Sequence, residues 1–297
     1  MKAKRIFNIG LWVLLCVPCL LTSCDHDVHD DKEESGLSVS LTWADEADQG
    51  TEVKDVKLWI FNASDGSLVE EKQYGGAQEV ASQRFQLPEG TYRILTTTNL
   101  TEPFFISEQT RSLTNWNNIQ IGLTNPKDVR NNAYFGVADV KIENKEGSYV
   151  VQTPIKSVLS ELTIIIENIP KGTEMSGKVL DCAGCLFPTQ KNSDGDYGLP
   201  SIEPTEVELP TLLATESTLK SEVIRPMPTI QGSPASHIYL RLQLPDKTLQ
   251  EFDITAPKMN VGGKYELRFK YEEMQPKMNL EATINGWTNL NNEVETK

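Results

Sequence analysis

The run Leu162-Thr163-Ile164-Ile165-Ile166 is the most apolar stretch of the chain beyond its first two dozen residues. It is rich in β-branched residues, which pack well on a pleated sheet and lose side-chain freedom in a helix. The wider segment, residues 158–169, ends at Pro170. A short apolar run that ends at a proline is typical of a buried strand. We therefore predict a central β-strand here.

The segments on either side alternate apolar and polar residues, which is the pattern of half-buried strands. Turn sequences separate these segments, and helical periodicity is hard to find in any long window. Strands are expected at 37–43, 56–61, 135–142, 148–152, 238–244, 250–256, 265–271 and 280–284. The fold class is therefore all-β, with a sandwich architecture.

The length of 297 residues is more than one hydrophobic core usually fills, so we expect two sandwiches in tandem. Thr153-Pro154 interrupts the strand pattern, and we place the boundary between the two domains there. The N-terminal domain then covers residues 37–154 and the C-terminal domain covers residues 155–297.

Residues 1–23 have the three parts of an export signal. A basic start at residues 2–5 precedes a mostly apolar run at 6–21, which is too short to span a bilayer, and small polar residues follow. Leu21-Thr22-Ser23-Cys24 resembles a bacterial lipobox. The resemblance implies cleavage between Ser23 and Cys24 and acylation of Cys24, which becomes the lipid-bearing N-terminus. The alternative is an ordinary secretory signal with an incidental cysteine.

An acidic tether, residues 24–36, follows the signal. Its tract at 25–34 contains residues of metal-binding type, but no later His or Cys pair completes a site, so a solvated tail is favoured. An acidic run behind a lipidated cysteine also resembles the surface-export signal of lipoproteins in Bacteroides-type bacteria. This resemblance implies attachment through lipid to the outer face of the outer membrane.

The formal net charge of −14 disfavours nucleic acid as a partner, because an acidic chain does not neutralise phosphates. Candidate catalytic residues are few. His237 is the only histidine beyond the tether, and without a partner it is more often a surface or cap residue than a base. No nucleophile elbow, Gly-rich phosphate loop or metal-ligand spacing is present. We expect no enzymatic activity, no cofactor and no metal.

Cys182-Ala183-Gly184-Cys185 is the sharpest local motif. A thioredoxin-type role needs the pair at a helix start, and zinc needs two more ligands, but the surroundings are loop and strand. We favour a disulfide between Cys182 and Cys185, formed after export. Free thiols remain the alternative, because a four-residue loop is tight for a disulfide.

Several stretches, in their order along the chain, resemble the fimbrillin superfamily, and most of all its FimB-type anchor and minor subunits. The usual proline before the last tryptophan is replaced here by Gly286. The stretches are residues 56–62 with Asp65-Gly66, 88–92 with 97–99, Tyr134-Phe135-Gly136, 158–166, 260–265 and 282–287.

The resemblance implies two transthyretin-like β-sandwich domains that assemble into surface fimbriae by β-strand exchange. In the family's shaft subunits an arginine-specific protease removes the N-terminal strand, whereas anchors keep that strand and their lipid. No arginine occurs between Arg5 and Arg84, so residues 37–55 offer no such cut, although Lys54 is open to other processing. The ten residues after Trp287 provide little tail to donate.

The sequence therefore predicts a lipid-anchored fimbrial subunit that anchors or terminates a surface fibre. Its partners would be other fimbrial subunits, the outer membrane and an unidentified host or bacterial surface ligand. Residues 37–43 would be the retained strand, and residues 280–287 would be a strand near the subunit interface. The alternatives are a shaft or adhesive tip subunit, or a glycan-binding surface lipoprotein with an aromatic platform built from Trp59, Trp116 or Trp287.

Overall fold

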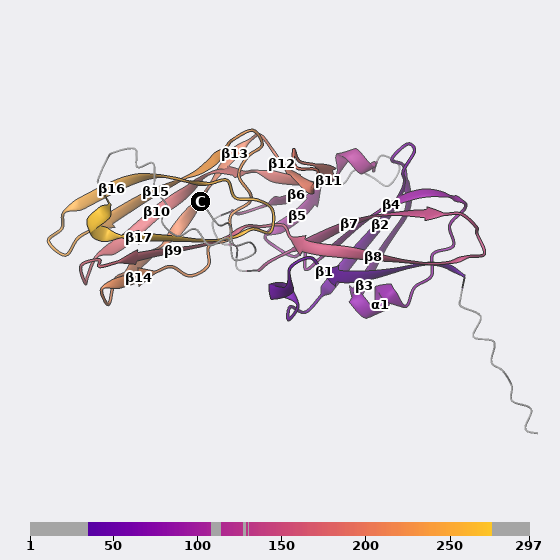
Figure 1. The fold of residues 1–297 in the computed structure, drawn as a ribbon, viewed down its shortest axis with the longest axis horizontal. Coiled ribbons are helices and arrows are strands. Elements are labelled where there is room, and N and C mark those ends of the chain that lie inside the picture. Colours follow the sequence, from indigo (N-terminus) through magenta and orange to yellow (C-terminus); the bar gives the residue numbers. More distant parts are fainter. Residues whose placement is uncertain (1–34, 108–113, 127–128, 130, 275–297) are drawn as a thin grey trace, which may run out of the picture. The chain divides into compact units, whose positions relative to one another are not determined.

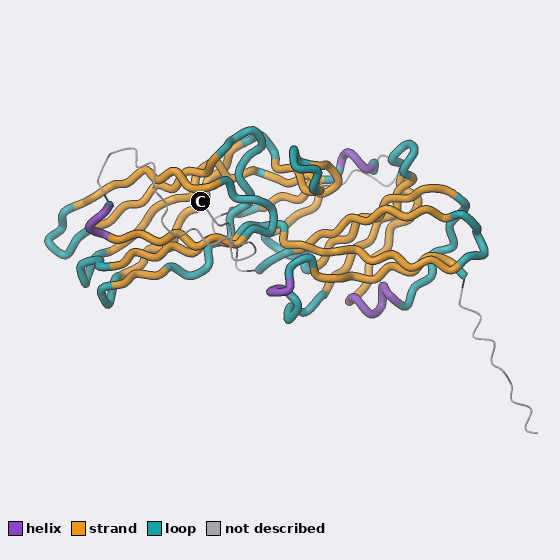
Figure 2. Tube along the Cα trace, in the orientation of Figure 1, coloured by secondary structure: helices purple, strands orange, loops and turns teal. Residues whose placement is uncertain are grey.

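The computed structural model describes residues 35–107, 114–126, 129 and 131–274. Within this part of the chain, strands form nearly all of the regular structure, with one short α-helix and three 3-10 helices. Figure 2 shows the same dominance of strand over helix along the trace. The all-β fold class predicted from the alternation is confirmed.

The largest sheet has six strands and contains both the first strand of the described chain and the antiparallel pair on either side of residue 65 (Figure 1). Helix α1 (Ala77–Ala81) and the 3-10 helix η1 (Glu46–Asp48) lie in its connections. In spatial order the strands are β1 (Gly36–Trp43), β8 (Ser148–Ser157), β7 (Tyr134–Ile142), β4 (Gly90–Thr98), β2 (Lys54–Asn62) and β3 (Leu68–Gly76).

The two faces of this sheet belong to different hydrophobic clusters. Along β2, Leu58 and Ile60 lie in one cluster, while Trp59 and Phe61 lie in the other. This division follows from the period-two geometry of a strand. The second cluster also includes residues of a four-stranded sheet, whose order is β12 (Tyr197–Pro200), β11 (Cys185–Lys191), β6 (Gln120–Leu123) and β5 (Phe104–Ser107), with η2 (Trp116–Asn118) before β6.

Two further sheets come from the second half of the chain. The apolar run at 162–166 lies in β9 (Glu161–Glu167), which is the central strand of its sheet, as predicted. One sheet has the order β13 (Pro204–Leu213), β10 (Glu174–Ala183), β15 (Ala235–Gln243), β16 (Leu249–Pro257); the other has β14 (Thr218–Lys220), β9 (Glu161–Glu167), β17 (Lys264–Lys270), followed by η3 (Tyr271–Glu273).

The chain does not break at Thr153-Pro154, because β8 runs through both residues. Pro154 is tolerated because β7 pairs with β8 only from Ile155 onward. On the side of β8 that faces β7, the Pro154 backbone therefore needs no hydrogen-bond partner. Strands β11 and β12 follow residue 155 in the sequence, yet β11 pairs with β6. The domain boundary placed near residue 154 stays a prediction.

Candidate functional site: the first strand and the Lys264 contact

Strand β1 lies at one edge of the six-stranded sheet. It pairs in parallel with β8 over eight residue pairs, from Gly36 opposite Ser148 to Trp43 opposite Ile155. The expected strand at residues 37–43 is thereby confirmed, and it is built into the sheet of its own chain.

The side chains of β1 form part of the core. Leu37 and Val39 are fully buried and belong to the cluster that contains Leu58, Ile60 and Ile94. Burying a leucine or valine side chain contributes about 1.5–3 kcal/mol relative to leaving it in water. Removing β1 would therefore expose apolar surface as well as break backbone pairing.

The outer side of β1 is covered at its start. The Leu37 N–H donates to the Phe85 carbonyl, and the Phe85 N–H donates back to the Leu37 carbonyl, both at 2.9 Å. The Ser38 hydroxyl donates to the Ala81 carbonyl at the end of α1, at 3.0 Å. The two bonds to Phe85 occupy backbone groups of Leu37 that an edge strand usually leaves open to another chain.

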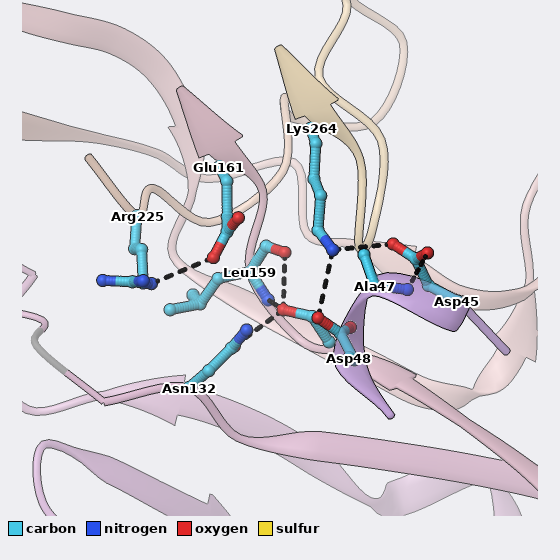
Figure 3. Close-up of polar contacts among 9 residues, drawn as sticks. Asp45, Ala47, Asp48, Asn132, Leu159, Glu161, Arg225 and Lys264 are labelled. Carbon is cyan, nitrogen blue, oxygen red and sulfur yellow. Dashed lines mark hydrogen bonds and ion pairs between the residues drawn. The ribbon is translucent and has the colours of Figure 1, made fainter. Parts of the chain in front are cut away.

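Behind the C-terminal end of β1, the chain makes the short helix η1 and contacts β17. The Asp45 carboxylate caps η1 by accepting from the Ala47 N–H at 3.0 Å. Lys264 Nζ lies 2.7 Å from Asp45 Oδ2 and 3.0 Å from Asp48 Oδ1. Figure 3 marks both ion pairs with dashed lines. We call these three residues the Lys264 contact.

The Lys264 contact is largely shielded from water, since the lysine side chain is only 12 % exposed. Burial is the largest influence and lowers the pKa of Lys264. The hydrogen bonds and charges of Asp45 and Asp48 together outweigh it, so the pKa lies above its ordinary value. The lysine is thus held in its charged form by two carboxylates from the loop after β1.

Other polar and aromatic contacts gather around the same place. Trp43 packs edge-on against Tyr134 with ring centroids 4.9 Å apart. Ser157 Oγ lies 2.7 Å from Asn132 Oδ1 and accepts from the Leu159 N–H at 3.0 Å. The Arg225 guanidinium pairs with Glu161 at 3.2 Å, at the start of β9. The ends of β1 and β8 and the starts of β9 and β17 lie close together here, since the Ala44 N–H donates to the Ile155 carbonyl and the Glu161 N–H donates to the Gly263 carbonyl.

The sequence patterns give no sign that Asp45 and Asp48 contact Lys264. Asp45 and Asp48 lie 219 and 216 residues from Lys264 along the chain. A contact at such separation leaves no local pattern in the sequence, so no signal was available to find it.

Both cysteines of the Cys182–Cys185 motif are free thiols, and the predicted disulfide is not formed in the structure. The physical reason is that the motif carries the chain from one sheet into another. Cys182 pairs with Thr205 at the end of β10, whereas Cys185 pairs with Gly122 at the start of β11. Burial raises the pKa of Cys182 to about 12.

His237 is exposed, as expected, but it has a partner that sequence reasoning missed. Its Nδ1 lies 2.6 Å from Asp181 Oδ2, because β10 and β15 are neighbours. Trp59 and Trp116 are buried in the core, so neither forms an exposed aromatic platform. Trp287 falls outside the described residues.

Several predicted features also fall outside the described residues: the signal at 1–23 with its Ser23–Cys24 cut, the lipidated Cys24, the acidic tract at 25–34 and the strand at 280–287. Among the described residues, no cluster of three or more potential metal ligands occurs. No helix in the same residues is long and apolar enough to cross a membrane.

These features define an all-β protein whose N-terminal strand completes its own sheet. The sequence matches, over residues 23–293, the model of the family described as fimbrillin-A associated anchor proteins Mfa1 and Mfa2. The chain therefore belongs to this family of fimbrial anchor proteins, and the resemblance drawn from its motifs is confirmed. No individual curated protein matches the sequence.

Solved structures with the same fold include the fimbrial anchor protein Mfa2 from Porphyromonas gingivalis. It is 14 % identical with a TM-score of 0.55, and the match covers 79 % of this chain and 90 % of that one. A candidate adhesin from Bacteroides thetaiotaomicron is 11 % identical with a TM-score of 0.54, over 80 % and 92 % of the two chains. A candidate polysaccharide-binding protein from the same organism is 8 % identical with a TM-score of 0.54, over 81 % and 94 %.

Proposed function

We propose that this protein is a lipid-anchored fimbrial subunit that anchors or terminates a surface fibre at the outer membrane. Acyl chains on Cys24 hold it there, and more than one chain is needed because a single chain binds only marginally. The next subunit joins by β-strand exchange, in which backbone pairing supplies affinity and alternate side chains supply register. The role is structural and needs no enzymatic activity.

The observation that carries this proposal is the state of β1. A subunit that accepts a donor strand needs an unfilled sheet edge over an incomplete core. Here β1 fills the edge of β8 along eight residue pairs, and Leu37 and Val39 already occupy the core. A chain with β1 in place does not accept a donor strand beside β8, so a fibre growing through that edge stops at this subunit.

The family supports an anchor role further, because its description names anchor proteins. The rival glycan-binding role has less support, since Trp59 and Trp116 are buried and are not available to stack on a sugar ring. A shaft or tip subunit would differ from an anchor in whether its N-terminal strand and lipid are removed by proteolysis. The N-terminus of the native protein is therefore the property to measure.

The test is mass spectrometry of the intact protein and of its N-terminal peptide, both taken from native outer membranes. We expect a chain that starts at an acylated Cys24 and contains residues 37–55 unbroken. The Cys24→Ser variant should lose both acylation and membrane retention, whereas Cys19→Ser, inside the predicted signal, should keep both. A native chain that starts beyond β1 and carries no lipid would overturn the anchor role and indicate a shaft or tip subunit.

A further inference from the structure

We propose that β1 and β8 form a mechanical clamp that is loaded in shear, with the Lys264 contact fastening its far end. The proposal rests on the proposed function in two respects: the tether before β1 is fixed to a membrane, and the next subunit joins through the part of the chain that follows β8. Tension on the fibre then enters the folded chain at Gly36.

The two strands lie in the orientation that shear requires. Strand β1 pairs in parallel with β8, and its first residue, Gly36, donates to the Gly147 carbonyl in the turn that precedes β8. Its last residue, Trp43, lies opposite Ile155 near the end of β8. A pull on the tether therefore acts at the beginning of β1, beside the beginning of β8.

The opposite pull reaches β8 at its other end, through the covalent chain. Strand β8 ends at Ser157, and after three residues the chain enters β9, the central strand of the sheet that also holds β14 and β17 (Figure 1). When a load acts on the beginning of one parallel strand and the end of the other, the strands must slide past each other. The eight residue pairs are then strained together rather than opened one after another.

Sliding also has to extract side chains. Leu37 and Val39 are fully buried, and Leu37 is bonded in both directions to Phe85 on the other side of β1. Any movement of β1 along β8 takes both side chains out of their positions in the core. Because interiors are close-packed, such a displacement meets resistance from the first step.

The Lys264 contact opposes the same movement at the C-terminal end of β1. A pull on Gly36 draws β1 and the following loop toward the beginning of the strand, away from β17. Asp45 and Asp48 would then have to leave Lys264, which starts β17 opposite Glu161 of β9. The charged hydrogen bonds thus tie the trailing end of β1 to the strands that receive the load through β9.

The clamp is testable by single-molecule force measurement on the mature chain, residues 24–297. Handles at Cys24 and at position 171 (Lys171→Cys) load the pair in shear. Handles at Cys24 and at position 145 (Lys145→Cys), beside the beginning of both strands, peel β1 from β8. Cys185→Ser removes the competing half-buried thiol in both chains, and both lysines replaced lie in exposed turns. We expect the first rupture to need a several-fold higher force in shear than in peeling, and equal forces would overturn the clamp.

A matched pair of substitutions on β17 tests the Lys264 contact. Lys264→Gln should lower the rupture force in the shear geometry. Lys270→Gln should leave it unchanged, because Lys270 makes an exposed pair with Glu273 on the surface. Equal effects of the two substitutions would remove the Lys264 contact from the proposal. These measurements do not depend on acylation, so their failure and a failure of the anchor role are distinguishable.

Discussion

Truncating Leu37 to alanine tests most directly whether β1 belongs to the folded core. Leu37 is fully buried among Leu58, Ile60 and Ile94, so Leu37→Ala removes apolar contacts and leaves a cavity. Buried leucine-to-alanine changes lower the free energy of unfolding by about 2–5 kcal/mol. Since β1 is an edge strand that can settle inward, we expect about 3 kcal/mol here. That is a large part of the roughly 5–15 kcal/mol by which proteins are stable.

The assay is urea unfolding followed by tryptophan fluorescence, since Trp59 and Trp116 are buried and report on packing. The midpoint urea concentration should fall while the slope of the transition stays unchanged. Leu249→Ala on β16 is the control, because that side chain is 44 % exposed and its loss should change stability by less than about 1 kcal/mol. If both substitutions lower stability equally, β1 is not part of the core, and the clamp and the retained-strand argument both fail.

Three further outcomes follow from particular atoms. The Cys182 thiol, with a pKa of about 12, is ionised to a fraction of only ~10⁻⁴ at pH 8. Iodoacetamide should therefore modify Cys185 first and Cys182 only after unfolding. Equal modification rates in peptide mass spectra would contradict the buried position of Cys182. An added Cβ at Gly177 would lie 2.1 Å from a backbone oxygen of β15, so Gly177→Ala should lower the melting temperature far more than Gly50→Ala, where nothing lies within 4 Å. The pKa of Lys264 is raised in the folded protein, so its contribution to stability is full below the unfolded pKa near 10.5 and is lost as pH rises through the folded pKa. The difference in unfolding free energy between the wild type and Lys264→Gln should therefore shrink above pH 10.5. A difference that stays constant would refute the charged contact.

Most of the strands could be predicted from the sequence, because each strand that covers a core needs one apolar face. The apolar run at 162–166 lies within β9, and the alternation at 238–244 overlaps β15, which begins three residues earlier and ends one residue earlier. Both patterns are local consequences of burial, so they can be read without knowing what packs against them. The parallel pairing of β1 with β8 could not be read, since register and partner depend on residues more than a hundred positions apart.

The candidate site was predicted only in part for the same reason. Residues 37–43 were chosen correctly as a strand, because their alternation is local. The Lys264 contact was missed, since its charges come together only after the sheets pack. The Cys182–Cys185 motif differs from both: its spacing is local, but the two residues enter different sheets and both thiols are free in the structure.

Strand exchange and anchoring make opposite demands on an edge strand. A strand that is to be replaced must leave at low free-energy cost, whereas a strand that bears load must not leave at all. Strand β1 combines buried side chains, reciprocal bonds to Phe85 and the Lys264 contact, and each of these raises the cost of its departure. If this subunit joins a fibre by strand exchange, the exchange must therefore use an edge other than the one that β1 fills beside β8. In that arrangement the joint to the next subunit and the joint to the membrane are separate, and a substitution that weakens one leaves the other intact.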